Sequence, residues 1–311
     1  MPTPDFVDWT NAVWEIISIV VITLLITFFL VFRRKELPVA ELATRLGVTE
    51  EQLRETHVTY KEAFVRKRTG GNRRLLIPND DLKALQRRIL RMLLARLKTH
   101  SAAFGFEPGR SIVDNARMHT GMDVVLKLDI IDFFPSTTAD TVRRYFRLIG
   151  WNREAADLLT QLTTWEEGLP QGAPTSPRLS NLVNYKLDAR IDGYVATQGA
   201  TYTRYADDIT IGFSIDYPSA VRSAATTVRT IIRDSGYRPN GRKQKILRQH
   251  QQQKVTGLVV NDRVNVPRHI RRKLRAVEHR LNTGQRATMT REQLDGWKAL
   301  LAMVEKQRSG G

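Results

Sequence analysis

Two strand-like segments that each meet aspartate constrain the fold of this chain more than any other feature. The stretch RYADDITIGF, residues 204–213, alternates like a hairpin around Ala206-Asp207-Asp208, and VVLKLD, residues 124–129, is an apolar strand ending in Asp129. If the two elements pair in one sheet, three carboxylates meet at one edge and raise each other's pKa. A surface Asp-Asp turn and an unrelated strand-end aspartate is the simpler alternative, and spacing alone leaves both open.

A divalent metal site would explain the three acids. Carboxylate oxygens suit Mg²⁺, which also takes phosphate oxygens as ligands. Two such ions are the standard device for in-line displacement at phosphorus, where one activates the attacking hydroxyl and the other stabilises the leaving pyrophosphate.

The charge of the chain favours a polyanionic partner. The net charge is +17, and residues 238–280 alone hold thirteen Lys and Arg against two acids. A clustered surplus of this size favours nucleic acid or acidic lipid as a partner over an incidental surface charge. The chain has no cysteine, which excludes disulfides and thiolate metal sites and fits a reducing compartment.

The N-terminal region predicts a membrane anchor. Residues 13–32 read VWEIISIVVITLLITFFLVF and carry no charge from Ile16 onward, close to the roughly 20 residues that cross a bilayer. Arg33, Arg34 and Lys35 follow at once, so the positive-inside rule puts the short N-terminus outside and the remainder in the cytoplasm. A cleaved signal peptide would have the reverse charge order, and a buried core helix would be shorter or show a polar face. We therefore predict a tail and single-pass anchor over residues 1–36.

The rest of the chain predicts mixed helices and strands. The expected elements, in order, are two short helices within 37–55 broken at Gly47, a basic hairpin over 60–78 with Gly70-Gly71 at its tip, a helix over 81–97, helices over 139–150 and 153–163, a helix from Pro177 to about 195, a helix over 218–235, strands near 246–248 and 255–260, and a basic helical tail from Pro267.

The motifs resemble those of reverse transcriptases, and they occur in the family's order. The matching stretches are RKRTGGNRRLLIP, LDIIDFF, LPQGAPTSP, YADD and NGRK. The resemblance implies an α+β right-hand polymerase fold with an antiparallel palm sheet. Residues 37–261 would form the fingers and palm, and residues 262–311 a basic helical thumb.

The resemblance also implies roles for single residues. Asp129, Asp207 and Asp208 would bind two Mg²⁺ ions and carry catalysis. Phe134 would exclude a ribose 2′-hydroxyl and so select deoxynucleoside triphosphates, while its neighbour Phe133 points the other way. The remaining nucleotide contacts would be Lys67 and Arg73 at the triphosphate, Gln171 and Gly172 beneath the nascent pair, and Lys243 at the pyrophosphate, with Lys245 a competitor for that last role.

Two further stretches resemble the retron type of this family. They are NARMH, residues 115–119, and VTGLVVN, residues 255–261. The retron resemblance implies copying of a structured noncoding RNA, priming from a guanosine 2′-hydroxyl, a branched RNA–DNA product, and antiphage defence with an effector protein. The RNA would contact Asn115, His119, Arg268, Arg271, Arg272, Lys273 and Arg275. Each stretch also has a plain alternative, a buried strand for VTGLVV and packed polar side chains for Asn115 and His119.

Other functions stay open at this point. The chain could be another bacterial defence reverse transcriptase, either protein-primed or untemplated, or a non-catalytic membrane-anchored RNA-binding scaffold. The predicted location is the bacterial inner membrane with the catalytic region in the cytoplasm. Because the predicted span departs from the common soluble retron pattern, the anchor itself is a hypothetical carrier of the effector function.

Overall fold

A computed structural model describes residues 14, 17–18, 20–21, 36–66 and 70–309. The predicted membrane span over residues 13–32 lies outside these residues except for five helical positions, and it stays a prediction. Within the described ranges, no helix combines the length and the apolar character that crossing a bilayer requires. Lys67, at the tip of the predicted hairpin, also lies outside the described residues.

The first elements match the sequence-based expectation. Helix α2 (Val39–Leu46) ends at Gly47, whose φ of 64° is a left-handed conformation that glycine adopts without strain. Helix α3 (Glu50–Glu55) begins with a capping box between Thr49 and Gln52. Strands β1 (Tyr60–Arg66) and β2 (Asn72–Pro78) form an antiparallel hairpin that pairs Tyr60 with Pro78.

A helical layer supports this hairpin. It contains α4 (Asp80–Arg88), the π-helix η1 (Ile89–Leu94), α7 (Ala139–Leu148), α8 (Arg153–Thr163) and α9 (Ser176–Val183), which share one buried apolar cluster with α2. The helix predicted over residues 81–97 is therefore present to Leu94, but its second half has π rather than α geometry. The wider π turn closes with Ala95 N–H donating to the Leu90 carbonyl, and the Arg178 guanidinium binds the Leu94, Ala95 and Leu97 carbonyls.

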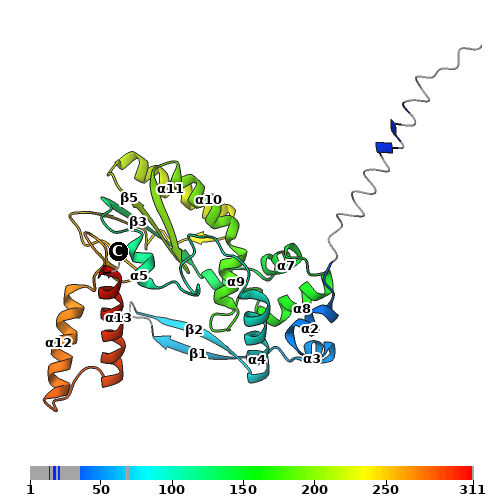
Figure 1. The fold of residues 1–311 in the computed structure, drawn as a ribbon, viewed down its shortest axis with the longest axis horizontal. Coiled ribbons are helices and arrows are strands. Elements are labelled where there is room, and N and C mark those ends of the chain that lie inside the picture. Colours follow the sequence, from blue (N-terminus) through cyan, green and yellow to red (C-terminus); the bar gives the residue numbers. More distant parts are fainter. Residues whose placement is uncertain (1–13, 15–16, 19, 22–35, 67–69, 310–311) are drawn as a thin grey trace, which may run out of the picture.

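The central sheet is antiparallel, as predicted. Its order is β4 (Ala200–Tyr205), β5 (Asp208–Phe213), β3 (Val124–Ile131) and β6 (Arg238–Pro239), and β7 (Lys245–Arg248) also pairs with β3. Helices α10 (Tyr185–Ala196) and α11 (Pro218–Asp234) cover one face, on which Leu126, Leu128 and Ile211 are buried (Figure 1). The opposite face carries the remaining side chains of β3 and β5.

One predicted helix is split in the structure. The helix expected from Pro177 to about residue 195 breaks between α9 and α10 at Asn184. The Asn184 amide donates to the Ser180 carbonyl four residues earlier and to the Tyr237 hydroxyl, both at 2.8 Å. A side chain that bonds to its own helix backbone bends that helix, and Tyr237 gives the bend a buried anchor.

The C-terminal part forms a separate layer at one end of the molecule. Strands β8 (Lys254–Val255) and β9 (Leu258–Val259) pair around Thr256 and Gly257, both at positive φ, so the continuous strand predicted over 255–260 is a tight hairpin. Helices α12 (Arg268–Asn282) and α13 (Arg291–Ser309) pack as a pair, and α13 lies next to α5 (Ile112–Arg117) (Figure 1).

Candidate active site

Strand register places two of the three predicted acids on the same face of the sheet. In β3 the even-numbered side chains from Val124 to Ile130 pack under α10 and α11, so the odd-numbered Asp129 points to the opposite face. Asp208 lies directly across from Asp129 in the β3–β5 ladder. Cross-strand partners project on one side, so both carboxylates belong to the face that points away from α10 and α11.

The third acid lies in the turn that joins β4 to β5. Ala206 has a φ of 56°, and the Asp207 carbonyl accepts a hydrogen bond of 3.1 Å from the Ile130 amide of β3. The turn is thus bound to the neighbouring strand through its backbone. Asp207 is held beside Asp129 and Asp208, as the sequence predicted.

Burial and neighbouring charge both act on Asp207. Burial, followed by the charges of Asp208 and Asp129, raises the pKa of Asp207 above its ordinary value. The Lys243 ammonium binds the Asp129 carboxylate at 2.8 Å, and this bond raises the pKa of Lys243. Asn240 also donates to Asp129 at 3.0 Å. Lys243 therefore offsets part of the negative charge.

The donor set suits a hard divalent cation. Three carboxylates that repel one another are the oxygen ligands that Mg²⁺ prefers. Within the described part of the chain, no three acidic, histidine or cysteine side chains stand grouped as a metal site, and Lys243 holds the Asp129 oxygen. A cation at these acids would compete with that lysine. The contact with Asp129 distinguishes Lys243 from the other candidate, Lys245, which lies in β7 opposite Lys127.

Phe134 lies at the start of the short helix α6 (Phe133–Ser136), three residues after strand β3 ends. Its neighbour Phe133 is buried against the Tyr237 ring, so the two phenylalanines point in different directions, as predicted. The Phe134 ring instead lies 6.1 Å from the ring of Phe106. Sequence reasoning did not identify Phe106.

The LPQGAPTSP loop is bound to the hairpin. The Gln171 carbonyl accepts a hydrogen bond of 2.8 Å from the Leu76 amide in β2. Gly172 has a φ of 129°, and a Cβ there would come within 2.7 Å of the Leu76 carbonyl. The glycine thus permits close approach to the backbone of β2, and the place of Gly172 beneath the nascent pair stays a prediction.

The two arginines of β2 have different surroundings. Arg74 binds Glu166 through two nitrogens at 2.8 and 2.9 Å and Glu62 at 2.6 Å. Arg73, the predicted triphosphate ligand, is exposed on the opposite face of the hairpin. Arg74 therefore links the hairpin to Glu166, while Arg73 stays accessible to an anionic ligand.

A buried ionic network lies behind the acids, and sequence reasoning missed it. Arg204 and Asp188 are both fully buried and form a two-pronged ion pair at 2.6 and 2.7 Å. Tyr202 donates to Asp188, and Arg204 also donates to the Ala206 carbonyl in the turn. No local signal in the sequence marks this pair, because α10 also carries Lys186, Arg190 and Asp192.

Asn115 and His119, predicted to contact RNA, are buried at 1% and 0% exposure. His119 Nε2 lies 2.7 Å from the Thr203 hydroxyl, and burial, followed by the charge of Lys127, lowers its pKa to about 3. Neither side chain can reach RNA directly in this structure, so that prediction is corrected. A neutral histidine packed against β4 positions α5 on the sheet.

The two stretches that resemble retron motifs meet in space. Thr256 donates to the Ile112 carbonyl at 2.8 Å, and Val113, Ala116, Val255, Leu258 and Val260 share one buried cluster. This cluster extends to Val304 of α13. The 115–119 and 255–261 segments therefore form the base on which the C-terminal helix is seated.

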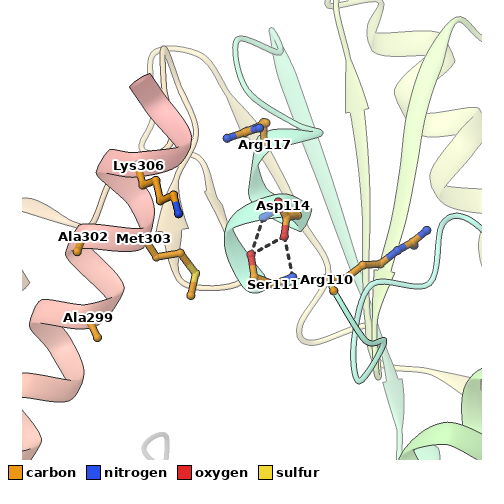
Figure 2. A pocket seen from close by; sticks show the side chains of 9 residues that line it. Arg110, Ser111, Asp114, Arg117, Ala299, Ala302, Met303 and Lys306 are labelled. Carbon is orange, nitrogen blue, oxygen red and sulfur yellow. Dashed lines mark hydrogen bonds between the residues drawn. The ribbon is translucent and has the colours of Figure 1, made fainter. Parts of the chain in front are cut away.

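A groove lies above that base, between α5 and α13. Its volume is about 780 Å³, and its lining includes Arg110, Ser111, Asp114, Arg117, Met303 and Lys306. Figure 2 shows Arg117 and Lys306 at the groove, whereas Arg110 points away from α13. Ser111 and Asp114 are engaged with each other in the cap of α5. The groove combines basic side chains with a small apolar wall.

The predicted basic residues of the tail lie on the exposed side of α12. Leu274 and Val277 face α13, while the five arginines and lysines that the sequence predicts as RNA contacts are exposed. Arg268, Arg271, Arg272 and Arg275 recur at helical spacing on one side of α12, so these four present a positive surface, while Lys273 projects at an angle to them.

Comparisons with known proteins show the family to which the chain belongs. The family model for reverse transcriptase (RNA-dependent DNA polymerase) matches residues 65–260. The retron Mx65 reverse transcriptase of Myxococcus xanthus is 36% identical over an alignment of 301 residues that covers 90% of this chain and 70% of that protein. The retron Ec86 reverse transcriptase of Escherichia coli is 38% identical over 231 residues, covering 74% and 71% of the two chains. A solved foamy viral protease–reverse transcriptase in complex with double-stranded DNA matches at a TM-score of 0.45 and 18% identity, over 70% of this chain and 32% of the viral one.

Proposed function

Because this chain belongs to the retron reverse transcriptases, and is thus an RNA-directed DNA polymerase, we propose that it copies a structured noncoding RNA into a branched, RNA-linked DNA. The observation that carries the chemistry is the β3–β5 register, which sets Asp129 opposite Asp208 with Asp207 in the adjoining turn. Nucleotidyl transfer needs this convergence of acids, and an RNA-binding scaffold does not.

Asp129, Asp207 and Asp208 would hold two Mg²⁺ ions. Bound there, the ions would supply activation of the attacking hydroxyl and stabilisation of the leaving pyrophosphate. Lys243, which contacts Asp129 at 2.8 Å, would release it when a cation binds and lie close enough to meet the pyrophosphate. The raised pKa keeps this lysine protonated, as that role needs.

The remaining side chains would bind and select the nucleotide. Arg73, exposed on β2, together with Lys67, would bind the triphosphate through charge-assisted hydrogen bonds. Phe134 would lie against the sugar of a deoxynucleoside triphosphate and exclude a 2′-hydroxyl. Support for this role comes from its position close after Asp129 in the chain, on a helix that begins where β3 ends.

The basic face of α12 would bind the RNA and its DNA copy. Arg268, Arg271, Arg272, Lys273 and Arg275 are exposed, and phosphate contacts of this kind supply affinity without sequence preference. The groove between α5 and α13 would add a second contact. We propose residues 262–311 as the thumb and residues 37–261 as the fingers and palm.

The nucleic acid made by the protein tests this proposal. The full chain is expressed with its flanking DNA, and the nucleic acid that co-purifies is sequenced before and after treatment with a debranching enzyme. A DNA covalently branched from an RNA guanosine supports the proposal. Unbranched DNA of random sequence would instead support a protein-primed or untemplated enzyme.

Substitution of the acids tests the chemistry. Asp207→Asn and Asp208→Asn should each lower DNA synthesis by at least about 10³-fold, because metal-assisted charge stabilisation contributes several kcal/mol. Mg²⁺ should also raise the melting temperature of the wild-type chain more than that of either variant. Unchanged synthesis by both variants would favour the scaffold.

We further propose that residues 13–32 anchor the protein in the bacterial inner membrane and that the system acts in antiphage defence. The uncharged run from Ile16 to Phe32 and the basic residues after it support the anchor. Deletion of residues 1–36 should release the protein from membrane fractions and abolish protection from phage. Full protection by the deleted form would separate the anchor from defence.

A further inference from the structure

Three residues other than glycine adopt left-handed backbone conformations on the segments around the acids. They are Asp132 at φ 47°, Ala206 at φ 56° and Phe106 at φ 64°. Asp132 and Ala206 lie in the turns that follow and precede the acids. Phe106 is distant from the acids in sequence, and a bulky aromatic residue rarely takes this conformation. Strain of this kind gathers at ligand-binding sites, where the surrounding structure enforces it.

The segment that carries Phe106 is pinned on both sides of it. Phe104 N–H donates to the Arg204 carbonyl at 2.8 Å. The Asn181 amide of α9 donates to the Gly105 carbonyl at 2.6 Å and to the Glu107 carboxylate at 2.7 Å. A Cβ on Gly105 would come within 2.9 Å of the Ala206 amide nitrogen. The loop is thus fixed to the turn that carries Asp207.

The Phe106 ring itself is not part of the core. It is 44% exposed, although its neighbours in the chain are held tightly. The centre of the ring lies 6.1 Å from that of Phe134 and 6.0 Å from that of Tyr205, within the range of favourable aromatic pairs. Phe106 therefore stands between the predicted sugar-contacting residue and the first residue of the YADD turn.

We propose that Phe106 is a specificity-determining residue: its ring supports Phe134 in the orientation that excludes a ribose 2′-hydroxyl. The inference rests on the proposed role of Phe134. Phe133 touches Phe134 at 5.6 Å between ring centres, and Phe106 supplies a second contact. Without the Phe106 ring, Phe134 can turn into the vacated space and leave room beside the sugar.

Phe106→Gly tests the ring without straining the backbone, since glycine accepts a positive φ. The full-length variant is given a DNA primer annealed to an RNA template, and kcat/KM is measured for one deoxynucleotide and for the matching ribonucleotide. The ratio of the two should fall about tenfold, the size of effect that one altered pocket contact produces. Phe106→Asn, which also tolerates this backbone conformation, should behave alike.

Three controls separate support of Phe134 from other effects. Phe106→Tyr keeps the ring and should restore wild-type discrimination. Tyr217→Ala removes another exposed aromatic side chain, beyond the far end of β5, and should leave the ratio unchanged. A melting temperature of Phe106→Gly at or above that of wild type shows that reduced selectivity does not come from unfolding.

The Phe134→Ala variant distinguishes failure of the inference on Phe106 from failure of the proposed role of Phe134. If Phe134→Ala lowers the ratio while Phe106→Gly and Phe106→Asn do not, the inference on Phe106 is overturned and the proposed role of Phe134 stands. If Phe134→Ala leaves the ratio unchanged, the proposed sugar selection fails, and the inference fails with it.

Discussion

The acid-bearing edge of the sheet and the basic helix α12 differ in how deeply their charged side chains are buried. At the sheet edge, Asp129 is 4% exposed, and the fully buried pair of Arg204 and Asp188 stands behind the Asp207 turn. Along α12, only Leu274 and Val277 are buried among its described side chains, and the basic ones reach solvent. A chemical step requires the reacting groups to be held in fixed positions, whereas binding a phosphate backbone requires mainly positive charge.

The largest expected effect comes from breaking the buried pair. Asp188→Ala leaves the Arg204 guanidinium without its partner in the interior and should destabilise the fold by about 3–5 kcal/mol. Arg190→Ala, on the same helix, breaks an exposed pair with Asp234 and should cost no more than about 1 kcal/mol. Urea unfolding of both variants gives the comparison. Similar losses would show that burial does not separate the two pairs.

Substitution of Asp207 should change the stability of the fold by a smaller amount and in the opposite direction. Burial, followed by Asp208, raises its pKa, so the folded chain keeps a proton that the unfolded chain has released. Stability from this group is thus lost as the pH rises from the ordinary carboxyl range through the raised pKa. Without Mg²⁺, Asp207→Asn should be more stable than wild type at pH 7 by on the order of 1 kcal/mol, although inactive.

The pH dependence of that gain is its test. The stabilisation by Asp207→Asn should shrink as the pH falls toward the ordinary carboxyl range, where wild type carries the proton in both states. Asp262→Asn, in an exposed loop, should give no comparable change. A gain that is constant with pH would point to packing rather than to charge repulsion.

The smallest effect on stability is expected along α12. Replacing Arg271, Arg272 and Lys273 together by Gln should change the free energy of unfolding by no more than about 0.5 kcal/mol per site. RNA binding should nevertheless weaken, with the slope of log K against log salt falling by about 0.7–0.9 for each phosphate that is no longer neutralised. The matched control is Arg222→Gln with Arg233→Gln on exposed positions of α11. An equal decrease of the slope in the control would make the binding a property of net charge alone.

Much of the acidic site could be predicted because its signals are local. Alternation along residues 204–213 predicts a hairpin, and a strand ending in Asp129 predicts a partner for it. The register places Asp129 across from Asp208 with Asp207 in the adjoining turn, whereas a shared metal site and the catalytic roles stay predictions.

The surroundings of several predicted site residues depend on contacts that no local sequence pattern contains. Asn115 and His119 read as RNA ligands, yet His119 is buried against Thr203, 84 residues away in the chain. Gly172 permits its loop to approach the backbone of Leu76, a partner that the sequence does not specify. Arg73 and Arg74 are neighbours with equal charge, and only the placement of Glu166 shows which of them is engaged.

The sequence by itself determined the reaction class, the order of the motifs, the hairpin and sheet elements, and the basic surface of the tail. The hairpin, the sheet elements and the basic surface follow from residue type and periodicity, which act over a few positions, whereas the reaction class follows from the resemblance of the ordered motifs to those of reverse transcriptases. Tertiary structure decided which polar groups are buried, which lysine meets Asp129, and that Phe106 stands between Phe134 and Tyr205. Those outcomes depend on the packing of distant segments, where burial and close approach set the free energy of each side chain.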